Sequence, residues 1–171
     1  MKKLLLLICF LQCTHSFSQD LATLKWWSPT QYKSHVIEGQ AWPDEVKSTY
    51  DRLPARAEGN VADDVWSLSS HSAGLMIRFR SNTKKIIVRY ETKNKDNYAM
   101  DHMPATGVSG IDLYAIDSDG KELWCAGTRS FSDTITYRFQ GLRANDTYHE
   151  KGREYRLYLP LYNQVNSLEI G

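Results

Sequence analysis

The chain has 171 residues, and its 21 basic residues nearly balance its 20 acidic ones. This balance gives no electrostatic reason to expect binding to nucleic acid or to an anionic membrane surface. A chain of this length is expected to form one domain with a core that needs no disulfide staples. After the first residues, no stretch is long and apolar enough to span a bilayer.

The N-terminus has the features of a secretory signal peptide. Two lysines at 2–3 precede an apolar run over 4–11, and the small residues Ser16 and Ser18 follow. The pattern predicts that residues 1–18 are removed on export, which leaves a single periplasmic or secreted domain over 19–171.

The cysteines allow a second interpretation of the N-terminus. A lipoprotein would be acylated at Cys13, but Gln12 is bulkier than the residue that usually precedes an acylated cysteine. Cleavage after Ser18 instead leaves Cys125 as the single cysteine, so no internal disulfide can form. We expect Cys125 to be buried as a small hydrophobic residue.

Alternating apolar and polar residues, typical of strands with one face in a core, recur along the chain from about residue 65. The pattern predicts a short helix over 43–53, where Pro43 stands near an N-terminus, and a hairpin turn over 117–120. Many short strands without crossover helices indicate an all-β, jelly-roll-like antiparallel β-sandwich. The expected strands are 65–68, 75–80, 85–90, 111–116, 121–126, 133–139, 154–159 and 165–170.

No catalytic or metal centre stands out. Asp146 and His149 have the Asp-x-x-His spacing of a hydrolase base, but no Gly-Asp-Ser or Gly-x-Ser-x-Gly supplies a nucleophile. His71 and His102 are not paired for zinc. The segment that begins at Asp117 lacks the twelfth-position carboxylate of a calcium loop. We therefore predict no catalytic residues, no metal and no cofactor, although an enzyme complete in itself, using His149, is kept as an alternative.

Five tryptophans could supply flat apolar faces for sugar rings: Trp26, Trp27, Trp42, Trp66 and Trp124. Trp26 and Trp27 are adjacent, so in an extended segment they point to opposite faces, and they are the candidates for stacking on sugar rings. Trp66 lies in a strand-like pattern and is expected in the core.

The longest irregular segment covers residues 93–109, and long loops in compact domains are commonly functional. A solvated loop is one interpretation. In the other it docks on a second domain, burying Tyr98, Met100 and Met103 and letting His102 reach a neighbouring site.

A family resemblance centres on the residues Gly110-Ile111-Asp112-Leu113-Tyr114. They resemble the Gly-x-Asp-Leu-Tyr signature of the N-terminal domain of bacterial SGNH/GDSL-hydrolase-type esterases. The likeness extends over about residues 36–171. Further similar segments, in the same order, are Tyr50-Asp51-Arg52-Leu53-Pro54, Val65-Trp66-Ser67-Leu68-Ser69, Ser72-Ala73-Gly74, Tyr158-Leu159-Pro160-Leu161-Tyr162-Asn163 and Leu168-Glu169-Ile170-Gly171.

The resemblance implies a non-catalytic sandwich that precedes an SGNH hydrolase domain and helps to shape its active site, with a carbohydrate ester as substrate. The hydrolase domain would supply the Gly-Asp-Ser block and would follow Gly171, so no catalytic residue carries over. The signature predicts Leu113 in the core and the opposite face as the docking or ligand surface. That surface comprises His102, Met103, Gly110, Asp112 and Tyr114. A free-standing carbohydrate-binding sandwich is the alternative function.

Overall fold

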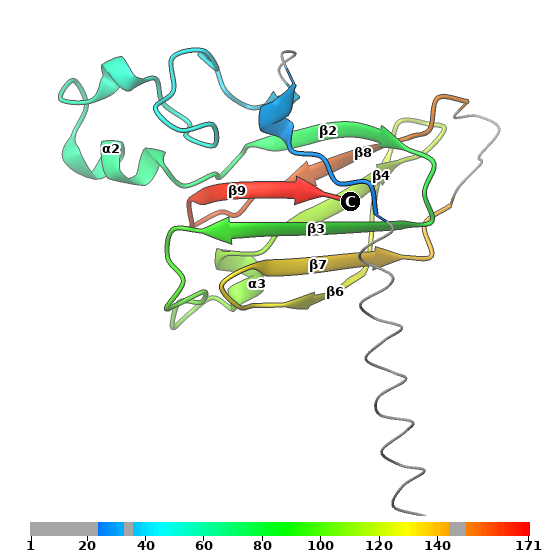
Figure 1. Cartoon of the computed structure of the whole chain (residues 1–171). Helices are drawn as coiled ribbons and strands as arrows, with labels where there is room; N and C mark the ends of the chain where they lie inside the picture. The colour runs from blue at the N-terminus through cyan, green and yellow to red at the C-terminus, as the bar shows by residue number, and fades with distance from the viewer. Residues whose placement is uncertain (1–23, 33–35, 144–149) are drawn as a thin grey trace, which may run out of the picture.

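The computed structural model describes residues 24–32, 36–143 and 150–171, which fold as two antiparallel β-sheets packed face to face (Figure 1). One sheet has the strand order β1-β2-β8-β4-β5 and the other β6-β7-β3-β9. The strands are β1 (Ile37–Glu38), β2 (Met76–Ser81), β3 (Lys85–Thr92), β4 (Asp112–Ile116), β5 (Glu122–Trp124), β6 (Gly127–Ser130), β7 (Ile135–Gln140), β8 (Arg153–Tyr158) and β9 (Val165–Ile170).

The chain crosses between the sheets along most of its length, as expected for a jelly-roll-like sandwich. It changes sheet from β2 to β3, from β3 to β4, from β5 to β6, from β7 to β8 and from β8 to β9. The helical elements are short: η1 (Pro29–Gln31), η2 (Ala55–Ala57), α2 (Asp63–Ser69) and α3 (Ala105–Val108). The prediction of an all-β sandwich is confirmed.

The core lies between the sheets and follows the alternation in the sequence. In β2, Ile77 is fully buried whereas Arg78 is exposed, and in β4 Leu113 is fully buried whereas Asp112 is exposed. Phe79 stacks on Tyr155 of β8 with ring centroids 5.6 Å apart. Burial of such side chains is the main stabilising contribution to this fold.

The predicted helix over 43–53 is wrong. The segment forms turns, in which Val46 bridges to Pro54 and the Glu45 carbonyl accepts a hydrogen bond from the Ala55 N–H. The Asp51 carboxylate accepts a bond from the Ser48 N–H at 3.0 Å. Such local side-chain bonds to the backbone compete with a helix and favour turns.

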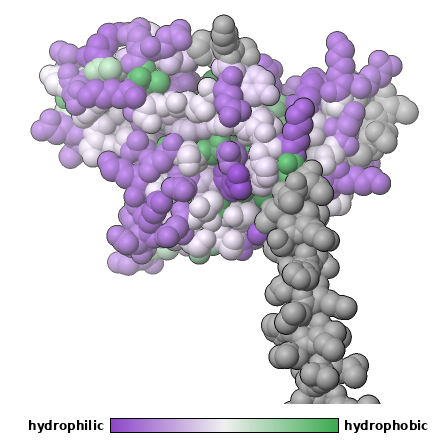
Figure 2. Space-filling model, in the orientation of Figure 1, coloured by the Kyte–Doolittle hydropathy of each residue, from purple (hydrophilic) through white to green (hydrophobic). Residues whose placement is uncertain are grey.

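The predicted strand over 65–68 is also wrong, because these residues belong to α2. The helix exposes Val65 and Leu68, which are each 51% accessible. Figure 2 shows a few apolar residues among hydrophilic ones in the upper left region, where α2 and the turns before it lie in Figure 1. Trp66 is half-buried rather than in the core, with the Lys47 ammonium 5.5 Å from its ring. Asp63 and Asp64 in the first turn suit the positive end of a helix.

Figure 1 shows α2 and α3 at the same end of the sandwich, here termed the loop end. Asn163 holds the connections at this end together. Its side chain is 3% exposed, accepts a bond from the Asn94 N–H at 3.2 Å, and donates to the Asn94 carbonyl and the Ser109 hydroxyl. Tyr90 donates to the Ser109 carbonyl at 2.6 Å. These bonds fix the connections β3–α3, α3–β4 and β8–β9 relative to one another.

Candidate docking and ligand surface around residues 110–114

Gly110 lies where the backbone passes closest to its neighbours. A Cβ at this position would stand 2.3 Å from the Thr106 carbonyl oxygen and 2.6 Å from the Tyr137 hydroxyl oxygen. No real side chain tolerates such distances, so glycine is required for α3 to turn tightly into β4. The structure thus explains the close approach expected at Gly110. The tight turn at this glycine places Asp112 at the start of β4, on the outer face of the sheet.

Asp112 stands on the outer face at the start of β4. Its Oδ1 accepts a hydrogen bond from the indole Nε1 of Trp124 in β5 at 3.1 Å. Trp124 is nevertheless 60% exposed, the largest value among the exposed large hydrophobic residues of the described chain. The carboxylate therefore holds the indole in one orientation while much of the ring stays open to solvent.

Tyr114, two residues further along β4, shares this outer face. Its ring packs edge-on against Tyr158 of β8, with centroids 5.6 Å apart. Tyr158 donates a hydrogen bond to Glu122 at 3.0 Å. Burial raises the pKa of the Tyr158 hydroxyl, and the Glu122 carboxylate raises it further, so the phenol stays protonated at neutral pH.

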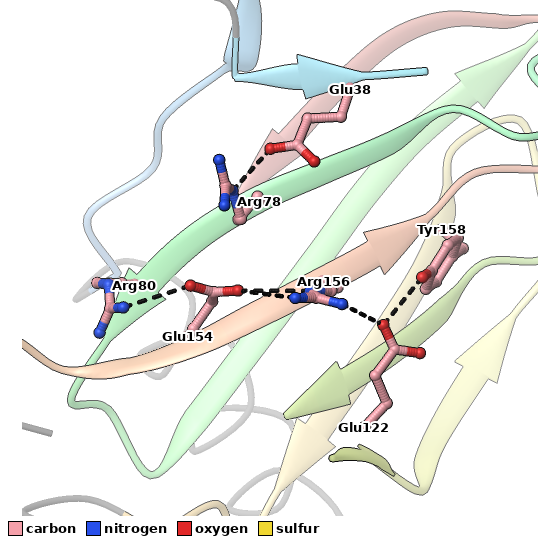
Figure 3. A network of polar contacts seen from close by, with 7 residues as sticks. All are labelled: Glu38, Arg78, Arg80, Glu122, Glu154, Arg156 and Tyr158. Carbon is pink, nitrogen blue, oxygen red and sulfur yellow. Dashed lines mark hydrogen bonds and ion pairs between the residues drawn. The ribbon is translucent and has the colours of Figure 1, made fainter. Parts of the chain in front are cut away.

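A ladder of paired charges continues from these tyrosines across the outer face of the five-stranded sheet (Figure 3). Arg156 in β8 lies at its centre and bonds both Glu122, at 2.8 Å, and Glu154, at 3.4 Å. Glu154 also contacts Arg80 at 3.3 Å. The hydrogen bond from Arg156 to Glu122 raises the pKa of the guanidinium, which keeps its charge. Pairs this exposed add little to stability.

A pocket of about 350 Å³ opens beside Asp112, at the edge where β5 and β6 approach α3. At Gly127 of β6 the Phe139 ring packs directly against the backbone, 2.8 Å from where a Cβ would stand, so this position leaves no room for a side chain. Arg129 faces this pocket from β6. The residues that line it are Pro104, Thr106, Gly107, Ile111, Asp112, Trp124, Cys125, Gly127, Arg129, Tyr137 and Phe139.

Cys125 lines the same pocket and is half-buried rather than fully buried. Burial raises the pKa of its thiol, so the group is protonated and weakly nucleophilic at neutral pH. Burial likewise raises the pKa of the Tyr137 hydroxyl. Neither group has the properties of an activated nucleophile.

The structure brings only part of the predicted surface together. Met103 packs against Gly107 in α3, beside the pocket, and the backbones of Met100 and Met103 pair in a tight turn. His102 is exposed at this turn and does not line the pocket. Tyr98 is partly buried, bonds the Ser132 carbonyl and packs on Phe131. The apolar part of the 93–109 segment thus already has contacts within the chain.

Trp26 and Trp27 point to opposite sides, and both rings have protein partners. The Arg89 guanidinium lies 4.0 Å from the centre of the Trp26 ring. Trp27 pairs with the Ile170 backbone, and its ring contacts Tyr32 and Phe79 with centroids 5.5 and 5.7 Å away. Their role in stacking on sugars stays a prediction.

Sequence reasoning counted Trp124 among the possible sugar-stacking residues but did not place it on this surface, and it missed Arg129 and Arg156. β6 was not predicted, so Arg129 was not assigned to a sheet face. The charged residues of β8 form ion pairs with residues of β2 and β5, and the sequence does not show which strands are neighbours. The alternation in Lys121–Ala126 could have placed Trp124 opposite Tyr114, since the two are register partners.

The predicted signal peptide, Cys13, Asp146 and His149 lie outside the described residues. Within residues 24–32, 36–143 and 150–171, no three His, Cys, Asp or Glu side chains gather as a metal site. No helix in this part of the chain has the length and apolar character to cross a membrane.

The fold and the surface define a class of protein: an antiparallel sandwich in which a Gly-x-Asp-Leu-Tyr sequence, residues 110–114, leads into β4 and each of its fixed positions has a structural role. The family model described as "GxDLY: N-terminus of Esterase_SGNH_hydro-type" matches residues 24–171. The chain belongs to this family, and the resemblance noted in the sequence is confirmed.

One solved structure is similar in fold. It is from Bacteroides ovatus ATCC 8483 and bears the description "putative GDSL-like lipase". The TM-score is 0.70 at 24% sequence identity, over 85% of this chain and 40% of that one. The chain therefore corresponds to less than half the length of that protein. No curated protein matches.

Proposed function

We propose that the chain is the non-catalytic N-terminal module of an exported SGNH/GDSL-type esterase, and that it docks on a hydrolase domain and helps to shape its active site. The family match over residues 24–171 carries the proposal, since the family is defined by its place at the N-terminus of such esterases. The sequence itself contains no Gly-Asp-Ser block.

The outer face of the five-stranded sheet is the proposed docking surface. Its charges are already paired, as in the bonds of Arg156 with Glu122 of β5 and with Glu154 of its own strand. A paired charge costs less to remove from water than an unpaired one, provided its hydrogen bonds are kept. Tyr114 and Tyr158 add an aromatic surface of the kind enriched at interfaces. Domain interfaces within one chain are typically polar in this way.

A carbohydrate ester is the proposed substrate of the assembled enzyme, and the periplasm or the cell exterior is its proposed location. The first residues support export, through the basic and apolar pattern of residues 1–18. The open Trp124 ring beside a carboxylate supports contact with a sugar.

Two observations test the proposal: an esterase assay of the purified chain, and the DNA sequence that follows its coding region. The purified chain should not hydrolyse p-nitrophenyl acetate above the rate in buffer. The reading frame downstream of the codon for Gly171, directly or after one frameshift, should encode a Gly-Asp-Ser block. Turnover by the chain that disappears in His149→Ala would instead make it an enzyme complete in itself. Absence of any such block nearby would remove the proposed partner.

A further inference from the structure

We propose that the pocket between α3, β4 and β6 binds a neutral sugar ring, stacked on Trp124 and held by Asp112 and Arg129. This goes beyond the proposed function, because it assigns a ligand site to the module itself. It also moves the expected sugar contact away from Trp26 and Trp27, whose rings contact Arg89, Tyr32 and Phe79.

The aromatic part of the site is pre-organised. Trp124 is 60% exposed, yet its Nε1 is fixed by the Asp112 carboxylate at 3.1 Å. In the described part of the chain, no aromatic ring or cation stacks on this indole, unlike Trp26 and Trp42, which are covered by Arg89 and Arg56. An open, fixed indole offers a flat apolar face without the entropic cost of ordering it on binding.

The polar part of the site has both an acceptor and a donor. Asp112 uses Oδ1 for Trp124, and its second oxygen has no recorded partner among the described residues. Arg129, also within the described residues, makes no recorded ion pair or hydrogen bond with them and lines the same pocket. Each guanidinium and carboxylate group has hydrogen-bonding capacity to spare.

The pairing of these charges selects the class of ligand. An anion would be attracted by Arg129 but repelled by Asp112. A cation would be attracted by Asp112 but repelled by Arg129. A neutral polyol satisfies both, since each hydroxyl donates to a carboxylate or accepts from a guanidinium. The volume of about 350 Å³ lies near the lower end of small-molecule pockets, roughly 300–1,000 Å³, and suits a short saccharide.

A second hollow of about 400 Å³ lies beside Trp27 and is lined by Arg78 and Arg80. It is a weaker candidate, because Arg78 is paired with Glu38 and Arg80 with Glu154. Both of its arginines are therefore already engaged within the chain.

The test follows the five indole N–H signals of the ¹⁵N-labelled chain by NMR during titration with methyl xyloside, methyl glucoside, methyl galactoside and soluble xylan. We assign the Trp124 signal with Trp124→Phe. At least one of these probes should shift this signal saturably while that of Trp42 stays unchanged. Trp124→Ala should weaken the binding about tenfold or more, and Trp42→Ala should not.

Asp112→Asn and Arg129→Gln separate the polar contacts from the stacking. Asn at position 112 keeps an oxygen for the indole N–H, so the fold and the Trp124 orientation should persist while affinity falls. No Trp124 shift with any probe, or equal losses in Trp124→Ala and Trp42→Ala, would overturn the proposal. Binding of galacturonate but of no neutral sugar would also overturn it. None of these outcomes bears on docking to a hydrolase domain, which is measured separately.

Discussion

At the scale of single residues, Gly110 leaves no room for a side chain. A Cβ there would meet the Thr106 carbonyl at 2.3 Å, and the backbone that supplies this oxygen cannot move without disturbing α3. We expect Gly110→Ala to lower the free energy of unfolding by about 2 kcal/mol or more, as overpacking does. Urea denaturation measures this change.

Gly107→Ala is the matched control. The new Cβ would meet only the Met103 side chain, at 2.8 and 3.0 Å, and this chain is flexible enough to move away. Alanine also favours the helix by about 0.5–1 kcal/mol. Equal destabilisation by the two substitutions would contradict the role assigned to Gly110.

Asp51 gives a prediction for pH dependence. Burial raises the pKa of its carboxyl above 3.8, although the Ser48 N–H bond opposes the shift, and its Oδ1 has no partner among the described residues. The folded state then holds the proton more tightly than the unfolded state. The resulting stability is complete below the unfolded pKa and is lost as the pH rises through the folded one.

Asp51→Asn keeps an oxygen for the Ser48 N–H but cannot ionise. Its free energy of unfolding should therefore rise relative to that of the wild type as the pH increases above 3.8. Urea titrations at several pH values check this, with the exposed Asp101→Asn as a control for the lost charge. If the difference in unfolding free energy between Asp51→Asn and the wild type does not vary with pH, or shrinks as the pH rises, burial does not destabilise the ionised Asp51 carboxylate.

At the scale of elements, Asn163 joins three connections of the loop end through its bonds to Asn94 and Ser109. Asn163→Ala removes these three bonds and leaves buried groups unpaired, which should cost about 2–4 kcal/mol. Chemical denaturation provides the value. The exposed Asn82→Ala should change stability by less than about 0.5 kcal/mol. A similarly small effect at Asn163 would mean that water replaces its bonds.

Strands that pack a full face on the core were predictable from the sequence, because each buries one side of an alternating pattern, as Ile77 in β2 and Leu113 in β4 do. The short edge strands β1 and β6 were missed. Only two residues form β1, and β6 has no buried alternation, since Thr128 and Arg129 are both exposed. The turns before α2 were predicted as a helix because local bonds such as that from the Ser48 N–H to Asp51 do not show in the apolar pattern. Trp66 was expected in the core, whereas in the structure it lies half-buried beside Lys47.

For the candidate surface, the sequence predicts which residues of β4 face outward but not which residues of other strands they contact. Leu113 inward and Asp112 outward follow from period two. The partner of Asp112 does not, because Trp124 reaches it from another strand. His102 had the right residue type for a site but lies on an exposed turn away from the pocket.

At the scale of the whole molecule, the two outer sheet faces differ in what they offer a partner. The five-stranded sheet carries the connected ladder centred on Arg156 (Figure 3). The four-stranded sheet carries the pair Arg89–Glu169 at 2.6 Å, with Arg89 also covering Trp26. Charge reversal on the first face should disturb docking of a hydrolase domain, and reversal on the second should not.

Glu122→Lys and Glu169→Lys are the matched variants, since each carboxylate pairs with an arginine and their side chains are 32% and 40% exposed. The decisive measurement is isothermal titration calorimetry, in which the wild-type chain and each variant are titrated into the SGNH hydrolase domain. This domain is the one encoded after the codon for Gly171. We predict binding that Glu122→Lys weakens about tenfold or more and Glu169→Lys leaves unchanged. No binding by the wild-type chain, or equal weakening by both variants, would contradict docking through this face.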